Sequence, residues 1–373
     1  MDELIWAEKV SEKIKKKVEL VAERNKNKIP YTTKDGSFDD MSQGNICWWT
    51  NGFWGGIMWQ LYHGTKNEMF REIAEENEKK LDQNLMEPQG LDHDNGFKWL
   101  PTAVANYRLT GNLKSRSRGL LAANNLAGRF NPVGSFIRAW NGDDDGRVAG
   151  WAIIDCMMNL PLLYWASKEI NDPRFMQIAT IHADTAVKYF VREDGSVNHI
   201  VEFNPATGEF VKTYGGQGYG EGSCWTRGQA WALYGFALSY KHTKKKLYLD
   251  TAKKVANYFI EHIWENGLVP VDFCQPKDCS LEDSTAAVIA ASGMLEIEKS
   301  VSKEEKKIYH EAAIGLLQAL EKERCNWDDN IDNILEKCTA AFHDKEHEFS
   351  IIYGDYFFIE AIWKLTGQEL FLW

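Results

Sequence analysis

The 373-residue sequence has few of the features that mark membrane, nucleic-acid-binding or secreted proteins. No apolar run approaches the roughly 20 residues that cross a bilayer. The first 20 residues read as an amphipathic helix and lack the apolar core of a secretory signal. Acidic side chains outnumber basic ones by 54 to 43, and the net charge of −11 disfavours nucleic acid and anionic membranes as partners. We therefore expect a cytoplasmic protein that binds neither.

The sequence also lacks metal-binding cysteine motifs and domain linkers. The seven cysteines are irregularly spaced and form neither a Cys-x-x-Cys pair nor a Cys/His zinc pattern. We expect reduced thiols and no metal. No linker or low-complexity stretch divides the chain, so a single domain over residues 1–373 is expected.

A pattern that predicts two helices joined by a short turn recurs along the chain. In each copy an apolar helix ends in an aromatic-containing tail, and a short polar turn leads to an amphipathic helix. The first helix of each pair, as predicted over 150–166 and 228–240, is apolar nearly all round and should be buried. The second helix should lie outside. The copies lie at 61–74, 106–123, 163–186, 239–259, more faintly 296–317, and in shortened form at 362–371.

Six such pairs predict an all-α fold, an (α/α)6 barrel with an inner ring, an outer ring and loops at one end. An open solenoid is the competing arrangement. The C-terminal GDYFFIEAIWKLTG favours closure, because it can complete the sixth pair with the N-terminal helix. Strand signals are sparse, but 196–203 and 209–214 flank an Asn-Pro-Ala-Thr-Gly turn and predict a small β-hairpin beside the cleft.

The segment GGQGYGEGSCWTRGQAW (215–231) concentrates side chains that suit a sugar acid. Its glycines allow a tight fold, so that the polar groups and indoles can converge. Indoles stack on sugar rings, amides and hydroxyls bond sugar hydroxyls, and arginine forms a two-pronged pair with a carboxylate. The plainer alternative is a glycine-rich loop that enters a core helix, with Trp231 as packing. The relevant side chains are Gln217, Ser223, Trp225, Arg227 and Trp231.

Two aspartates are candidates for acid–base chemistry. Asp94, in LDHDNGF, precedes a helix expected to start near Gly96, and it is either a functional carboxylate or an N-cap. Asp155 falls inside the apolar helix predicted over 150–166, where burial would raise its pKa toward that of a working general acid. A structural aspartate bonded to a cap or an arginine is the alternative. Both are expected at the same end of the barrel.

Further aromatic loops are expected around this cleft. CWWTNGFWGG (47–56) carries Trp48 and GSFIRAW (134–140) carries Trp140. The total of 15 tryptophans exceeds what packing usually demands and is typical of a carbohydrate cleft. His199, in the hairpin, either contacts a ligand or bonds to the backbone.

Through CWWTNGFWGG, DHDNGF, IIDCMMNL, NHI, WTRGQAW and the terminal YGDYFFIEA, the chain resembles glycoside hydrolase family 88, the unsaturated glucuronyl hydrolases, nearly end to end. The related unsaturated rhamnogalacturonyl hydrolases share the barrel, but an RGNGW-like sequence is expected there in place of RGQAW (227–231). The resemblance implies hydration of the 4,5 double bond that polysaccharide lyases leave in a terminal uronic acid. The implied substrate is a small anionic oligosaccharide, and no cofactor is implied.

The resemblance also implies roles for individual residues. Asp155 would act as general acid and base, while Asp94 would hold the ring and stabilise positive charge. The substrate-binding residues implied are Trp48, Trp140, His199, Gln217, Ser223, Trp225, Arg227 and Trp231. Residues 338–350 depart from the longer Gly- and Ser-rich loop expected in the family, which leaves sulfate preference open. An inverting glycosidase, a sugar epimerase with paired histidines and a non-catalytic sugar-binding protein remain alternatives.

Overall fold

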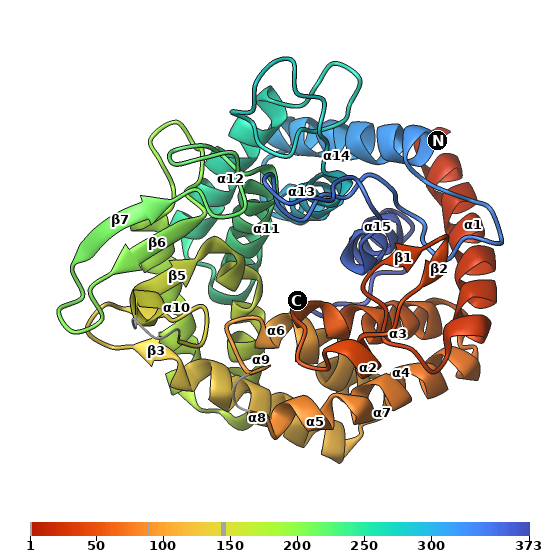
Figure 1. Cartoon of the computed structure of the whole chain (residues 1–373), viewed down its shortest axis with the longest axis horizontal. Coiled ribbons are helices and arrows are strands. Elements are labelled where there is room, and N and C mark those ends of the chain that lie inside the picture. Colours follow the sequence, from red (N-terminus) through yellow and green to blue (C-terminus); the bar gives the residue numbers. More distant parts are fainter. Residues whose placement is uncertain (1, 88–89, 143–146) are drawn as a thin grey trace.

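The computed structural model describes residues 2–87, 90–142 and 147–373, and shows six helix pairs in two concentric rings (Figure 1). The inner ring consists of α3 (Phe53–Thr65), α6 (Asn95–Trp99) with α7 (Ala105–Thr110), α9 (Leu160–Ile170), α11 (Thr226–Thr243), α13 (Ser284–Ile297) and α15 (Ile352–Leu365). The outer ring consists of α1 (Asp2–Asn25), α4 (Glu68–Lys80), α8 (Leu113–Gly128), α10 (Pro173–Tyr189), α12 (Lys246–Glu261) and α14 (Lys303–Glu323). The predicted (α/α)6 barrel is confirmed.

The recurring polar turn has a common local cause. Inner helices α3, α7, α9 and α11 each end at a residue in the left-handed conformation, for example Gly111 (φ 74°) and Asn171 (φ 53°). In three of these four turns the next residue caps the outer helix, as Asp172 does by accepting from the Arg174 backbone N–H. The left-handed residue stops one helix and the side-chain oxygen starts the next, so the chain reverses within two residues.

The inner ring closes on itself. α15 packs against α13, against α3 and against the N-terminal helix α1, and Figure 1 shows the red α1 and the blue α15 side by side at this seam. An open solenoid would leave α3 and α15 apart, so that alternative is wrong. Aromatic side chains fill the barrel interior, where Trp231 contacts Phe97 and Phe357 with ring centroids 5.0 and 5.5 Å apart.

The prediction of one continuous helix over 150–166 is wrong. Residues Trp151–Ile153 form strand β5, Ile154–Met158 form a 3₁₀ turn (η5), and α9 begins only at Leu160. A short apolar run fits a buried strand as well as a helix, and Pro161 in the first turn of α9 favours a helix start there. Asp155 therefore lies in η5, between the strand and the helix.

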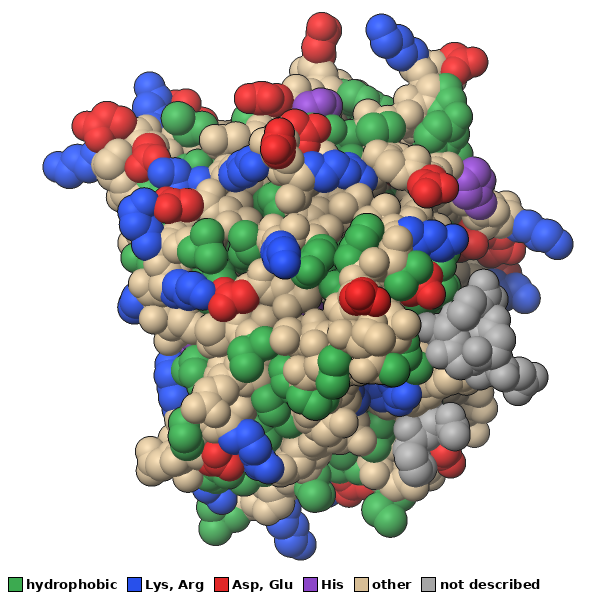
Figure 2. Space-filling view, turned by 90° about the vertical axis from the view of Figure 1, so that its left-hand side faces the viewer, with side chains coloured by type: hydrophobic (Ala, Val, Ile, Leu, Met, Phe, Trp, Pro, Cys, Tyr) green, Lys and Arg blue, Asp and Glu red, His purple; other side chains and the backbone are tan. Residues whose placement is uncertain are grey.

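The predicted hairpin is confirmed, but it belongs to a larger sheet. β6 (Ile200–Phe203) pairs antiparallel with β7 (Phe210–Tyr214) on one side and with β5 on the other, with Ile153 opposite Ile200. β5 holds η5, and with it Asp155, against the hairpin. Figure 2 shows acidic, basic and apolar side chains interspersed on the face of the molecule that carries this sheet.

The remaining short elements lie mainly in the loops. They are α2 (Met41–Gly44), α5 (Asp82–Leu85), the 3₁₀ helices η1 (Trp49–Gly52), η4 (Arg147–Gly150) and η6 (Glu298–Ser300), the π-helix η3 (Leu100–Val104) between α6 and α7, and the two-residue strand pairs β1 (Thr33–Lys34) with β2 (Ser37–Phe38) and β3 (Phe130–Asn131) with β4 (Phe136–Ile137). Within the described ranges, no helix is both long enough and apolar enough to span a membrane.

Candidate active site

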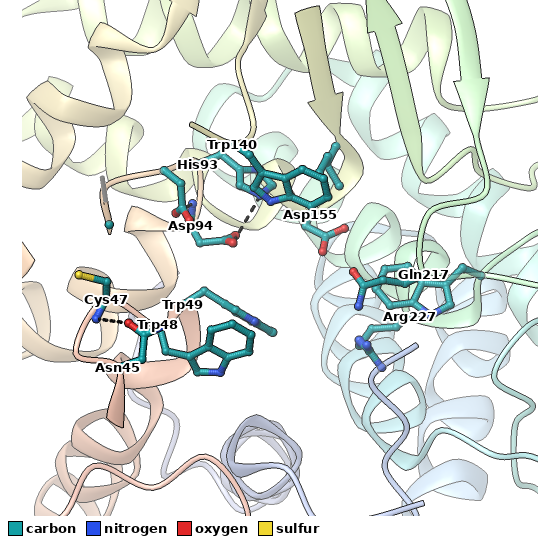
Figure 3. Close-up of a pocket in the computed structure, with 14 residues that line it drawn as sticks. Asn45, Cys47, Trp48, Trp49, His93, Asp94, Trp140, Asp155, Gln217 and Arg227 are labelled. Atoms are coloured by element: carbon teal, nitrogen blue, oxygen red, sulfur yellow. Dashed lines mark hydrogen bonds and ion pairs between the residues drawn. The ribbon is translucent and has the colours of Figure 1, made fainter. Parts of the chain in front are cut away.

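A pocket of about 510 Å³ opens where the loops before several inner helices meet, a volume typical of small-molecule sites. Figure 3 shows carboxylates, indoles and a guanidinium converging on it. The lining residues are Asn45, Cys47, Trp48, Trp49, Gly90, Asp92, His93, Asp94, Trp140, Ile153, Asp155, Gln217, Trp225 and Arg227. Seven of the ten predicted site residues are among them.

The inner helices direct their N-termini at this pocket. Asp94 occupies the residue before α6, Trp225 the residue before α11, and Asp155 lies one turn before α9. The N-terminal end of a helix carries partial positive charge from the helix dipole, so several such ends near one site favour an anion. A protein with a net charge of −11 can in this way hold a negatively charged ligand.

Asp155 lacks a partner for a negative charge. One of its carboxylate oxygens, Oδ1, is buried without a hydrogen bond within the described structure, and the nearest cationic candidate, Nε2 of His199, lies 3.7 Å away. Burial raises the pKa of Asp155 to about 7, and the nearby Asp94 adds to the rise while His93 opposes it. At neutral pH a large fraction of Asp155 therefore carries a proton that it can donate into the pocket.

Asp94 has partners that Asp155 lacks. Its Oδ2 lies 3.4 Å from Nε2 of His93, and its Oδ1 accepts a hydrogen bond of 3.1 Å from Asn159. Burial disfavours a charged His93, but Asp94 and Cys156 together outweigh burial and raise the His93 pKa well above its usual range. The Asp94 side chain makes no capping hydrogen bond to α6, so the N-cap alternative is wrong. Its carboxylate faces the pocket instead (Figure 3).

Arg227 and Trp225 form a stacked wall opposite Asp94. The guanidinium lies 4.4 Å from the Trp225 ring centroid. It also forms a buried ion pair with Asp283 and donates 2.5 Å to the Thr339 carbonyl. The Asp283 carboxylate and the loop carbonyls fix the plane of the guanidinium, whose charge is shared with Asp283 before any ligand arrives.

His199 and Gln217 belong to one connected loop structure. Nδ1 of His199 accepts a 3.0 Å hydrogen bond from the Gln217 backbone N–H, so the backbone-bonded alternative for His199 is confirmed. Burial lowers the His199 pKa to about 3, so the ring is neutral and its Nε2–H is directed toward Asp155. Gly216 makes this approach possible, because it has φ 58° and a side chain there would lie 2.1 Å from the imidazole.

Two of the predicted residues lie away from the pocket. Trp231 is fully buried among aromatic rings in the barrel interior, as the packing alternative predicts. Ser223 donates a 2.7 Å hydrogen bond to Asp272 and accepts one from the Gly220 N–H, which stabilises the glycine-rich loop. His199 likewise is not a lining residue, since it lies behind Asp155.

Several residues that line the pocket, or that bond to lining residues from behind, received no role from the sequence. His93 and Asp92 stand in the same DHDNGF phrase as Asp94, so their proximity was available as a signal. Asn159, in the MMNL phrase, reaches Asp94 only because η5 ends beside α6. Asn45, Cys47 and Trp49 form the remaining wall, and nothing in their spacing distinguishes them from Trp48.

Residues 21–353 match the model of Glycosyl Hydrolase Family 88. The chain is similar to the unsaturated glucuronyl hydrolase of Bacillus sp. (strain GL1), with 34% identity over 333 residues that cover 87% of this chain and 88% of that protein. It is 33% identical over 337 residues to the unsaturated chondroitin disaccharide hydrolase of Streptococcus pneumoniae, covering 87% and 83%. The crystal structure of a mutant unsaturated glucuronyl hydrolase from Streptococcus agalactiae, complexed with dGlcA-GalNAc6S, has a TM-score of 0.84 at 27% identity, covering 99% of this chain and 94% of that one.

Proposed function

Because the chain belongs to glycosyl hydrolase family 88, it is a glycoside hydrolase, and we propose that it removes the 4,5-unsaturated uronic acid from the non-reducing end of lyase-generated oligosaccharides. The observation that carries this proposal is Asp155, a largely desolvated carboxyl with a pKa of about 7 that lines the pocket. Unsaturated chondroitin disaccharides are the named substrate of the Streptococcus pneumoniae relative, so glycosaminoglycan-type disaccharides are the first substrates to test.

The first step is a proton transfer to carbon. The ring oxygen and the C4=C5 bond of the unsaturated uronate form a vinyl ether, whose electron-rich carbon is C4. Asp155 gives its proton to C4, and the electron pair of the double bond becomes the new C–H bond. Positive charge then spreads over C5 and the ring oxygen. A general acid works best when its pKa is near the operating pH, which the burial of Asp155 provides.

The second step adds water to C5. The Asp155 carboxylate formed in the first step, whose Oδ1 lies 3.7 Å from Nε2 of His199, now accepts a proton from the attacking water. The resulting hemiketal opens to a 4-deoxy-5-keto uronate and releases the rest of the sugar chain. The bond from C1 to its oxygen is not attacked directly, so the carboxylate spacing of ordinary glycosidases does not decide the outcome.

Asp94 and the stacked wall prepare the substrate for these steps. The Asp94 carboxylate, held by His93 and Asn159, stabilises the positive charge and bonds ring hydroxyls. Arg227 donates N–H groups to the uronate carboxylate, assisted by the helix N-termini, and Gln217 bonds a polar group of the sugar. Trp48 and Trp140 offer faces for stacking, whereas Trp225 lines the pocket stacked against Arg227.

Isotope labelling tests this reaction directly. Turnover of a Δ4,5-unsaturated chondroitin disaccharide should remove the ultraviolet absorbance of the conjugated double bond. In ¹⁸O-water the label should appear at C5 of the uronate product, as mass spectrometry can show, and in heavy water deuterium should appear at C4. Label at C1 of the uronate, with its double bond retained, would replace this proposal with ordinary glycosidic displacement, the inverting-glycosidase alternative.

A further inference from the structure

Two buried histidines and one buried thiol form a cluster next to Asp94. Cys156 follows Asp155 in η5, His182 comes from the core-facing side of outer helix α10, and His93 precedes Asp94. All three side chains are buried. Nδ1 of His93 and Nε2 of His182 have no hydrogen-bond partner of standard geometry within the described ranges. The Cys156 thiol is the polar group that interacts with both rings.

The backbone fixes the direction of this cluster at its far end. Nδ1 of His182 accepts a 3.0 Å hydrogen bond from the backbone N–H of Ile137 in β4. That nitrogen therefore carries no proton, and the ring proton of His182 is on Nε2, the atom that faces the thiol. At the near end, Nε2 of His93 lies 3.4 Å from Oδ2 of Asp94.

We propose that His182 and Cys156 form a buried relay that positions His93, and through it the carboxylate of Asp94. In this relay Ile137 N–H donates to His182 Nδ1, His182 Nε2–H donates to Cys156 Sγ, Cys156 Sγ and His93 Nδ1 share a proton, and His93 Nε2–H donates to Asp94 Oδ2. The relay holds the His93 proton on the nitrogen that faces Asp94. His182 and Cys156 are positioning residues, because neither lines the pocket. This inference rests on the role proposed for Asp94.

The electrostatics of the cluster support the relay. Burial alone would raise the pKa of the Cys156 thiol, but His182 and His93 more than offset it and lower that pKa to about 7. Asp94 raises the pKa of His93 despite its burial. A proton between Cys156 and His93 is thus readily shared, and either position leaves an N–H directed at Asp94. Asp155, His199 and Arg129 are the other ionisable groups that influence these three residues.

Simple packing is the competing explanation of the same residues. His182 occupies a position of α10 where Ala179, Ala183 and Ala186 also face the core, so it could be a core histidine satisfied by Ile137 alone. Packing predicts that the size of the side chain at 156 matters and that its hydrogen-bonding capacity does not. The relay predicts the reverse, because serine can accept and donate where alanine cannot.

The test compares Cys156→Ala, Cys156→Ser and a control, Cys338→Ala, which removes another fully buried thiol. In ¹⁵N-histidine-labelled protein, with the His93 signals assigned by loss in His93→Gln, wild type should show the ring proton on Nε2. Cys156→Ala should shift those signals and lower kcat on an unsaturated disaccharide about tenfold, the scale of one hydrogen bond to a charged pair, with KM little changed. Cys156→Ser should restore kcat to within about threefold of wild type.

The outcomes separate the possibilities. Unchanged His93 signals in Cys156→Ala would overturn the relay. This holds if kcat equals that of the Cys338→Ala control, and it holds equally if kcat and the melting temperature fall together. A Cys156→Ser variant that is as impaired as Cys156→Ala, in activity and in the His93 signals, would also overturn it. If wild-type protein fails to turn over any unsaturated disaccharide, the proposed function fails, while the nitrogen spectra of the three variants still decide the relay.

Discussion

Asp355 is buried and Asp155 is 16% exposed at the pocket, yet the loss of hydration raises the pKa of each to about 7. Asp155 lines the pocket, and its Oδ1 has no hydrogen-bond partner in the described structure. Asp355, in the first turn of α15, accepts backbone N–H bonds of 2.7 Å from Leu335 and 3.0 Å from Ile334, one on each oxygen. A raised pKa is therefore common to both, and it does not mark a catalytic acid by itself. The difference is that Asp155 lines a pocket and has an oxygen without a hydrogen-bond partner, whereas both oxygens of Asp355 are bonded.

The largest expected effect is on turnover by Asp155→Asn. The amide keeps the shape of the carboxyl but has no acidic proton for C4, so kcat should fall about 100- to 10,000-fold. Folding should be intact, because no hydrogen bond to Oδ1 is lost. Kinetic assays with circular dichroism check this, and a variant that retains a third of wild-type activity would remove Asp155 from the mechanism.

Asp94→Asn should also lower kcat, by about 100-fold, because the neutral amide stabilises the cationic transition state poorly. The side chain caps no helix, but the variant loses the negative charge that faces buried His93, so the melting temperature should fall modestly. Measuring kcat and KM separately tests this. If KM alone rises, Asp94 only binds substrate and does not share the chemistry.

Asp355→Asn should give the opposite pattern. The amide nitrogen cannot accept, so one of the buried N–H groups of Ile334 and Leu335 loses its partner. The free energy of unfolding should fall by about 2 kcal/mol, while kcat stays near that of wild type. Urea titration and the absorbance assay measure the two quantities. A large loss of kcat in the folded variant would erase the contrast with Asp155.

The smallest effect concerns stability against pH. The folded-state pKa of about 7 lies above the usual 3.8, so the folded protein binds more protons than the unfolded chain between these values. Stability therefore falls as pH rises through this range. Asp155→Asn removes one of the two groups, so between about pH 6 and about pH 8 it should lose less stability than wild type, by about 1 kcal/mol. Urea titrations at several pH values measure the free energy of unfolding. If it falls with pH equally in the variant and in wild type, the raised pKa of Asp155 is contradicted.

The fold was predictable because its signals are local. A left-handed residue followed by a capping side chain recurs at the helix turns, and the apolar patterns separate inner from outer helices. The stretch 150–166 failed because β5 owes its strand conformation to pairing with β6, a partner some 50 residues away. Periodicity within the stretch contains no trace of that partner.

The candidate site was predictable to the level of segments. WTRGQAW indicates a sugar-acid cleft, but its local pattern does not show that Trp225 lines the pocket while Trp231, on the following helix, turns into the barrel interior. Asp155 and Asp355 both lie in apolar segments of the sequence. They are distinguished only by the tertiary partners of Asp355, the backbone N–H groups of Ile334 and Leu335. The cluster of His93, Cys156 and His182 joins three separate elements and has no signature in the sequence.

The central claim is that Asp155 acts first as an acid, and the pH dependence of kcat/KM tests it most directly. With an unsaturated disaccharide as substrate, kcat/KM should decline above about pH 7, as Asp155 loses its proton in the free enzyme. Asp355→Asn should show the same decline. A rate that stays level or rises up to about pH 9 would mean that Asp155 works as a carboxylate from the start, and would contradict protonation of C4 by this residue.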